Sequence, residues 1–213
     1  MSLKLITEFI DFHDCEILTE QNENHEKIYR IKGPFLQAEV KNRNGRRYAH
    51  PILEREVSKF NNEKILRKRA FGELDHPPTP SINLDRVSHI IESLDSDGSN
   101  SWIGVAKLID TPSGKIAQVL VKEGCLLGVS SRGVGSLNGE RVNDDYNMVT
   151  VDIVADPSAP DAFVNGILEN KEFIIEGSKY VEYAVNRLKE QVDKKYNSKV
   201  VLQYMLEFIE AIH

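Results

Sequence analysis

The alternation of apolar and polar residues predicts a β-rich middle for this chain. In residues 35–41 the side chains of Leu36, Ala38 and Val40 fall on one side, as in a strand with one buried face. Further strand-like patterns occur at residues 86–94, 101–109, 126–137 and 147–154. The turn-forming residues 95–98 separate the first two of these segments and predict a β-hairpin.

Helical spacing occurs in three other places. A helix is predicted over residues 51–69, because a proline opens it and apolar residues follow on one face. A second helix is predicted from Thr111-Pro112 to Gly124, with inward-facing Ile116, Val119 and Leu120. From Ser178 to the end, apolar residues recur at helical intervals, which predicts a helical tail.

These patterns divide the chain into three parts. Residues 1–26 end in a polar run and are expected to form a loosely held N-terminal arm. Residues 27–176 are expected to form the folded domain, and residues 177–213 the helical C-terminal tail. The predicted fold class is therefore α+β.

Composition and charge narrow the functional classes. The chain has 213 residues, 40% hydrophobic and 28% charged, as in folded globular proteins. Its 27 Lys and Arg against 33 Asp and Glu give a net charge of −6, which argues against nucleic-acid binding. No apolar run approaches the ~20 residues that span a bilayer, and acids interrupt the N-terminal apolar stretch, so we expect a cytoplasmic protein without membrane contact. Cys15 and Cys125 predict neither a disulfide scaffold nor a zinc ribbon.

A strand rich in glycine and serine is the first candidate for chemistry. Residues 128–135 interrupt an apolar run with Ser130 and Ser131. A serine nucleophile needs an accessible hydroxyl, a nearby base and backbone N–H groups for the oxyanion, and this stretch can supply the first and the last. The competing interpretation is an ordinary Gly/Ser-rich strand edge.

His76 and Asp152 are the other candidates. His76 lies between an acidic turn and two prolines, and its ordinary pKa of about 6.5 suits a general base, although a surface or capping role is also compatible. Asp152 interrupts a strand, where it is either exposed on an edge or buried with a partner such as a histidine N–H. His89 could join His76 at a metal, but further ligands are missing, so we expect no metal and no other cofactor.

Taken together, these segments resemble the prohead proteases of large myoviruses, whose relatives include the herpesvirus assemblin proteases. Four blocks in the same order carry the resemblance and cover about residues 35–165, namely Gln37–Asn44 with Arg47-Tyr48 and Ile52-Leu53-Glu54, then Gly72–Pro78, Gly128–Gly133 and Pro157–Ala162. The resemblance implies a mostly antiparallel β-barrel surrounded by helices. It makes residues 27–176 the protease domain and extends less well to the arm and the tail.

The resemblance also implies a catalytic triad formed by the nucleophile Ser130, the base His76 and the acid Asp152. Backbone N–H groups from Ser131 to Gly133 would form the oxyanion hole, with Arg132 in support. For Arg132 a structural ion pair is the alternative. On a strand Ser131 points away from Ser130, so Ser131→Ala should spare the activity that Ser130→Ala removes.

The implied function is that of a serine endopeptidase of virion maturation, working inside the prohead in the host cytoplasm. The implied partners are scaffolding core proteins, the major capsid protein and further copies of the chain, which in the herpesvirus relatives form dimers. Substrates, including the protease itself, would be cut after glutamate in apolar-x-Glu motifs, with candidate self-cleavage at Glu8, Glu20, Glu169 and Glu176. The arm and tail would then be propeptide-like segments, the tail docking a zymogen onto the scaffold. The alternatives are an inactive structural or scaffold-binding component and an esterase-like hydrolase.

Overall fold

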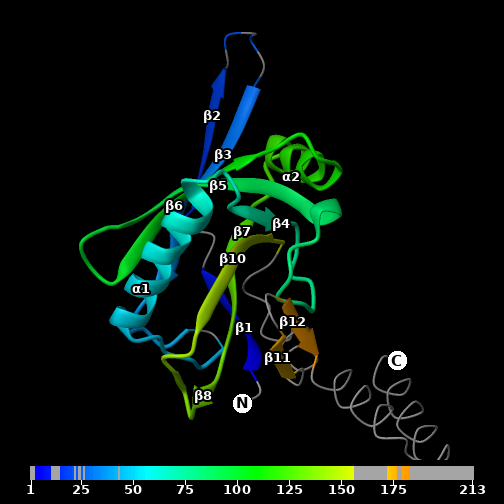
Figure 1. Ribbon diagram of the computed structural model, residues 1–213. Helices are drawn as coiled ribbons and strands as arrows, with labels where there is room; N and C mark the ends of the chain where they lie inside the picture. The colour runs from blue at the N-terminus through cyan, green and yellow to red at the C-terminus, as the bar shows by residue number, and fades with distance from the viewer. Residues whose placement is uncertain are drawn as a thin grey trace, which may run out of the picture.

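Two antiparallel five-stranded sheets form the framework of the protein (Figure 1). The computed structural model describes residues 3–10, 15–21, 23, 25, 27–42, 44–155, 172–176 and 179–182. The first sheet has the strand order β10-β7-β1-β11-β12, the second has the order β2-β3-β6-β5-β4, and β8 pairs with β9 in a ribbon. The strands are β1 (Leu3–Ile10), β2 (Glu16–Gln21), β3 (Lys27–Gln37), β4 (Phe71–Glu73), β5 (Val87–Ser96), β6 (Ser101–Leu108), β7 (Gly128–Gly135), β8 (Leu137–Asn138), β9 (Arg141–Val142), β10 (Asn147–Val154), β11 (Glu172–Glu176) and β12 (Lys179–Glu182).

The two sheets meet where β4 lies beside β10. Leu74 forms a bridge with Ile153, and the N–H of Asp75 donates a hydrogen bond to the carbonyl of Ile153 at 2.7 Å. Among the described residues, β2 and β12 remain unjoined at the far edges, and the β2–β3 hairpin projects from the body (Figure 1). The described strands do not close into the predicted barrel, whereas a mostly antiparallel α+β fold is confirmed.

The predicted hairpin and both predicted helices of the middle region are confirmed. β5 and β6 pair antiparallel across the turn. The helix α1 (His50–Phe60) continues into a π-helical turn, η2 (Asn61–Ile65). The helix α2 (Pro112–Lys122) begins at Thr111, whose hydroxyl accepts a hydrogen bond from the N–H of Gly114 at 3.0 Å. A short 3₁₀ turn, η3 (Leu84–Arg86), precedes β5.

The inward face predicted for α2 is wrong. Ile116 is 54% exposed and Val119 57% exposed, and only Leu120 of the three predicted residues packs against the core. The helix is buried through Gly114 and Ala117 instead. A Cβ on Gly114 would lie 1.9 Å from the carbonyl oxygen of Ile109, so the close approach of the helix selects small residues.

The strand predicted over residues 35–41 is displaced toward the N-terminus. β3 ends at Gln37, and residues 38–40 bend away from the sheet. Phe35 and Leu36 are adjacent and both fully buried, because the ladder with β6 is irregular between Pro34 and Leu36. Strict alternation therefore fails at this point.

The two ends of the chain also differ from expectation. β1 lies inside the first sheet between β7 and β11, and β2 pairs with β3, so the loosely held arm predicted for residues 1–26 is wrong for these segments. Residues 179–182 form β12 instead of helix. The rest of the predicted tail, residues 183–213, lies outside the described residues.

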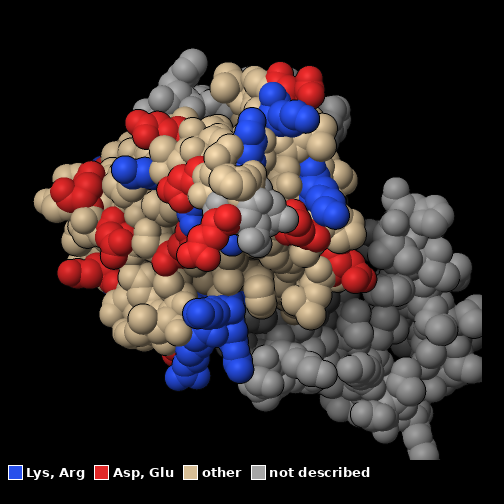
Figure 2. Space-filling model, turned by 90° about the horizontal axis from the view of Figure 1, so that it is seen from above, with Lys and Arg blue, Asp and Glu red and all other residues tan. Residues whose placement is uncertain are grey.

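The core fills the space between the sheets and α1, and the surface carries mixed charge. The fully buried core includes Phe35, Leu53 and Ile153. Acidic and basic side chains are interspersed over the face seen from above (Figure 2). Within the described segments, no helix has the length and apolarity required to cross a membrane.

Candidate active site

Ser130 lies on β7, a strand that is buried along its whole length. The register of the sheet places Ser130 opposite Asp152 on β10, so their side chains point to the same face. Both residues are fully buried. The two strands therefore hold a hydroxyl and a carboxylate on one inner face, with room for a third group between them.

His76 supplies that third group from the segment after β4. Asp75 has φ 66°, an uncommon conformation for a residue other than glycine, and its carboxylate accepts a hydrogen bond from the N–H of His76 at 2.9 Å. The ring of His76 lies with Nδ1 2.8 Å from Asp152 Oδ2 and Nε2 2.6 Å from Ser130 Oγ. The structure thus brings the three predicted residues into one line of hydrogen bonds.

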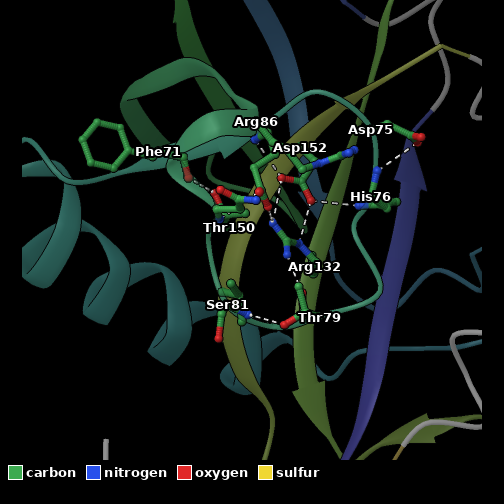
Figure 3. A network of polar contacts seen from close by, with 12 residues as sticks. Phe71, Asp75, His76, Thr79, Ser81, Arg86, Arg132, Thr150 and Asp152 are labelled. Carbon is green, nitrogen blue, oxygen red and sulfur yellow. Dashed lines mark hydrogen bonds and ion pairs between the residues drawn. The ribbon is translucent and has the colours of Figure 1, made fainter. Parts of the chain in front are cut away.

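Asp152 is surrounded by donors (Figure 3). Besides His76, it accepts hydrogen bonds from the N–H of Glu73 at 3.0 Å and from Arg132 Nε at 2.8 Å. Burial by itself would raise the pKa of Asp152, but the hydrogen bond from His76 and the charge of Arg132 outweigh it and lower the pKa below its ordinary value. An ionised Asp152 fixes the tautomer of His76, because it requires a proton on Nδ1 and leaves Nε2 to accept.

Arg132 connects two buried carboxylates. Its guanidinium forms ion pairs with Asp152 and with Glu73, and it also donates to the carbonyl of Thr79. The other oxygen of Glu73 accepts a hydrogen bond from the N–H of Asn83 at 2.9 Å. The ion-pair role considered for Arg132 is therefore the one that its side chain has here, and Glu73 is a site residue for which sequence reasoning gave no role.

His89 is placed away from the triad and faces the backbone of β10. Its Nε2 lies 3.0 Å from the carbonyl oxygen of Val151, and its Nδ1 lies 2.9 Å from Ser88 Oγ. Burial lowers the pKa of His89 to about 4, so the ring is neutral. Among the described residues, no three His, Cys, Asp or Glu side chains are grouped so as to hold a metal ion.

The opposite face of β7 carries Ser131 and Gly133. Ser131 Oγ is buried and has no hydrogen-bond partner of good geometry. A Cβ on Gly133 would lie 2.5 Å from the hydroxyl oxygen of Tyr146, so glycine makes room for that ring. Ser131 therefore points away from His76, as strand geometry predicts.

The candidate cleavage residues lie in different settings. Glu8 is on β1 and is buried, and its backbone carbonyl oxygen accepts a hydrogen bond from Ser130 Oγ at 2.5 Å. Glu20 is exposed on β2, an edge strand, and Glu176 ends β11. Glu169 lies outside the described residues. Sequence reasoning missed the contact between Glu8 and Ser130, because 122 residues separate the two positions.

Comparisons with known proteins agree with this geometry. The family described as prohead core protein serine protease matches residues 13–173. The prohead core protein protease of Enterobacteria phage T4 is 43% identical over 143 residues, covering 63% of this chain and 66% of that protein, just under two thirds of its length. The solved structure of the bacteriophage T4 capsid assembly protease matches with a TM-score of 0.66 and 35% identity, covering 73% of this chain and 99% of that one.

Proposed function

Because the chain belongs to the prohead core protein serine protease family, we propose that it is a serine endopeptidase that acts in phage capsid assembly. The observation that carries the proposal is the unbroken line from Asp152 through His76 to Ser130, with separations of 2.8 and 2.6 Å. Each position has the chemical type that acyl transfer requires, and each is held by strands or by a turn of fixed conformation.

In this mechanism Ser130 attacks the scissile carbonyl carbon while His76 Nε2 takes the hydroxyl proton. His76 then delivers that proton to the leaving amine, and water repeats the sequence to release the acyl group. Asp152 stays ionised and stabilises the imidazolium, while Arg132 and Glu73 keep Asp152 in position. Backbone N–H groups at residues 131–133 would stabilise the oxyanion.

The substrate class follows from the resemblance, which implies cleavage after glutamate in apolar-x-Glu motifs. The chain contains this motif at the four candidate self-cleavage positions, Glu8, Glu20, Glu169 and Glu176. The same triplet occurs at Ile52-Leu53-Glu54 within α1 and at Ile90-Ile91-Glu92 within β5, and Glu8, Glu20 and Glu176 also lie in strands, so cleavage at any of these motifs would require the local structure to open first. Cleavage after Glu20 and Glu176 would leave residues 21–176, which contain the proposed protease domain of residues 27–176, and would release propeptide-like segments.

The proposed partners are scaffolding core proteins, the major capsid protein and other copies of the chain, and the proposed location is the prohead in the host cytoplasm. An inactive structural component is the rival proposal. The buried ion network of Asp152, Arg132 and Glu73 supports the enzyme, because two buried carboxylates and a guanidinium are costly to bury and serve to hold one histidine.

Labelling and mass spectrometry test the proposed function. Wild-type protein should react with a serine-reactive phosphonate and should shorten over time, with new C-termini at one or more of the four candidate glutamates. Ser130→Ala should show neither change. If wild type and Ser130→Ala stay equally unlabelled, and neither cuts a peptide that contains Leu-Thr-Glu, the chain is the inactive component. Labelling without peptide cleavage would indicate an esterase-like hydrolase.

A further inference from the structure

The N-terminal strand lies directly against the proposed nucleophile. The hydroxyl of Ser130 donates to the carbonyl oxygen of Glu8 at 2.5 Å, and Ser130 is fully buried. β1 pairs with β7 in a register that sets Glu8 opposite Ser131 and Phe9 opposite Ser130. β1 is thus an extended chain that pairs with β7 and brings a backbone carbonyl to the hydroxyl of Ser130. A bound peptide substrate would take the same place.

The contact between Ser130 and the carbonyl of Glu8 opposes attack of Ser130 on another peptide. The hydroxyl oxygen of Ser130 lies 2.5 Å from the carbonyl oxygen of Glu8 and 2.6 Å from His76 Nε2, so its single proton is shared between two competing acceptors. β7 is also paired on both edges, by β1 and by β10, so β1 covers the edge of β7 on which another strand could pair. Attack on another peptide requires the proton of Ser130 and access to this edge of β7, and β1 competes for the proton and occupies the edge.

The buried side chain of Glu8 interacts with four polar side chains, those of Asn42, Arg46, Tyr48 and Tyr146, and we call this set the Glu8 pocket. Burial raises the pKa of Glu8 to about 8, although Asn42 and Arg46 both act to lower it. Glu8 Oε2 and the hydroxyls of Tyr48 and Tyr146 are buried without a hydrogen bond of good geometry. A carboxyl buried beside an amide, a guanidinium and two phenols is surrounded by groups that could interact in the same way with the carboxyl of another chain.

The other edge of β1 is held by few contacts. β11 pairs only with Leu3 and Lys4. Farther along, Asn44 Nδ2 donates to the carbonyl of Thr7 at 2.7 Å, and Arg46 Nη1 donates to the same oxygen at 3.4 Å. A competing strand therefore needs to replace the ladder between β1 and β7 and the core contacts of Leu5 and Ile6.

We propose that Ile6-Thr7-Glu8 occupies the groove in which a peptide of the same apolar-x-Glu pattern binds to β7, and that the Glu8 pocket is the subsite for the glutamate side chain. This inference rests on the proposed protease function. The family match begins at residue 13, after β1, so the occupying strand lies outside the matched part. Substrate then binds by displacing β1 and pairing with the same edge of β7.

A reversible crosslink tests the occupancy. Leu5 and Val134 are paired across β1 and β7, so Leu5→Cys combined with Val134→Cys permits a disulfide that pins the strand. Cys15→Ser and Cys125→Ser remove the native thiols, and Ser130→Ala prevents turnover. Fluorescence anisotropy then measures binding of a dye-labelled peptide that contains Leu-Thr-Glu to the oxidised and the reduced protein.

We expect the reduced protein to bind the peptide at least tenfold more tightly than the oxidised protein. Equal affinities, or no binding to either form, overturn the proposal. Leu5→Cys alone, treated with the same oxidant, is the control and should bind like the reduced protein. Phosphonate labelling is measured separately on protein that retains Ser130. This measurement distinguishes a wrong assignment of the groove from a wrong assignment of the protease function.

Substitutions in the Glu8 pocket test the subsite. Arg46 favours the ionised carboxylate, so Arg46→Met should reduce the preference for a Leu-Thr-Glu peptide over a Leu-Thr-Ala peptide roughly ten- to hundredfold. Arg67→Met, on an exposed turn, is the matched control and should leave that preference unchanged. If Arg46→Met does not fold, Tyr48→Phe removes one pocket hydroxyl and should lower the preference severalfold. An unchanged preference in a folded pocket variant rules the subsite out.

Discussion

The two faces of β7 differ in how their polar groups are satisfied. On the face of Ser130, the carboxylate of Asp152 accepts from His76, from Arg132 and from the N–H of Glu73. This set of opposite charges is fully buried, yet each carboxylate has a cation and a backbone donor. Such complete pairing lets ionised groups remain in a low-dielectric interior.

The other face is polar but unsatisfied. Ser131 Oγ, Glu8 Oε2 and the hydroxyls of Tyr48 and Tyr146 are all buried without a hydrogen bond of good geometry. Burial raises the pKa of Glu8 to about 8, so this carboxyl is protonated where Asp152 is ionised. One strand thus separates a saturated ion network from a pocket with unused polar groups.

The difference between the two faces indicates which groups hold a fixed geometry and which groups could contact another chain. A saturated network loses several interactions when one member moves, so it fixes the geometry of His76. On the other face, Glu8 Oε2 and the hydroxyls of Tyr48 and Tyr146 lack such a full set of partners, so they fix their surroundings less firmly. The comparison therefore places the groups that position His76 on one face of β7 and the proposed subsite for glutamate on the other.

The largest effect is expected when the saturated face loses its cation. Arg132→Met leaves Asp152 and Glu73 as buried carboxylates without a cation, which should lower the free energy of unfolding by about 3–5 kcal/mol. Displacement of Asp152 and His76 should also lower kcat/KM for a peptide substrate on the order of 100-fold. Urea unfolding and peptide hydrolysis measure the two effects.

Two further variants isolate the cause. Glu73→Gln added to Arg132→Met removes one uncompensated charge, so the double variant should regain part of the lost stability. Arg30→Met is the surface control, because Arg30 pairs with Glu20 and Glu92 near solvent and should cost no more than about 1 kcal/mol. Equal costs for Arg30→Met and Arg132→Met would contradict the distinction between the two settings.

Sequence patterns predicted the parts of the fold that depend on local signals. The hairpin of β5 and β6 follows from alternation and a turn, and α2 follows from the cap at Thr111. The same local rules failed for Ile116 and Val119, because close packing through Gly114 rotates the helix. They also missed the place of β1, since its partner strand β7 lies more than a hundred residues away.

The candidate site was predicted by resemblance more than by pattern. The strand pattern left Asp152 either exposed or buried with a partner, and only the three-dimensional register sets it opposite Ser130. Glu73 gave no signal of its own, because a single acid in a short strand does not reveal that Arg132 will reach it. Local sequence patterns do not reveal contacts between residues that are far apart in the chain, such as those of Asp152 with Ser130 and of Glu73 with Arg132.

An intermediate effect is expected from removing the charge of Glu8. Burial raises the pKa of Glu8 from its ordinary value of 4.5 to about 8 in the folded chain, so its protonated form stabilises the fold, and this contribution is lost as the pH rises from about 4.5 to about 8. Glu8→Gln has no such titration. Between pH 4.5 and 7, wild type should therefore lose about 3 kcal/mol of unfolding free energy relative to Glu8→Gln.

Urea unfolding at several pH values measures this difference. Glu54→Gln, at an exposed position of α1, is the matched control and should follow wild type. Parallel pH curves for wild type and Glu8→Gln would mean that the carboxyl of Glu8 has about the same pKa in the folded chain as in the unfolded chain. In that case the contrast between the two faces of β7 would disappear.

The smallest effect is expected from Ser131→Ala, which removes a hydroxyl that has no hydrogen bond of good geometry. A buried hydroxyl in this state contributes little, so stability should change by less than about 1 kcal/mol. The backbone N–H of Ser131 remains, so peptide hydrolysis should stay within about threefold of wild type, whereas Ser130→Ala abolishes it. A loss above tenfold for Ser131→Ala would mean that its hydroxyl takes part in the reaction, and the two faces of β7 would then share the chemistry instead of dividing it.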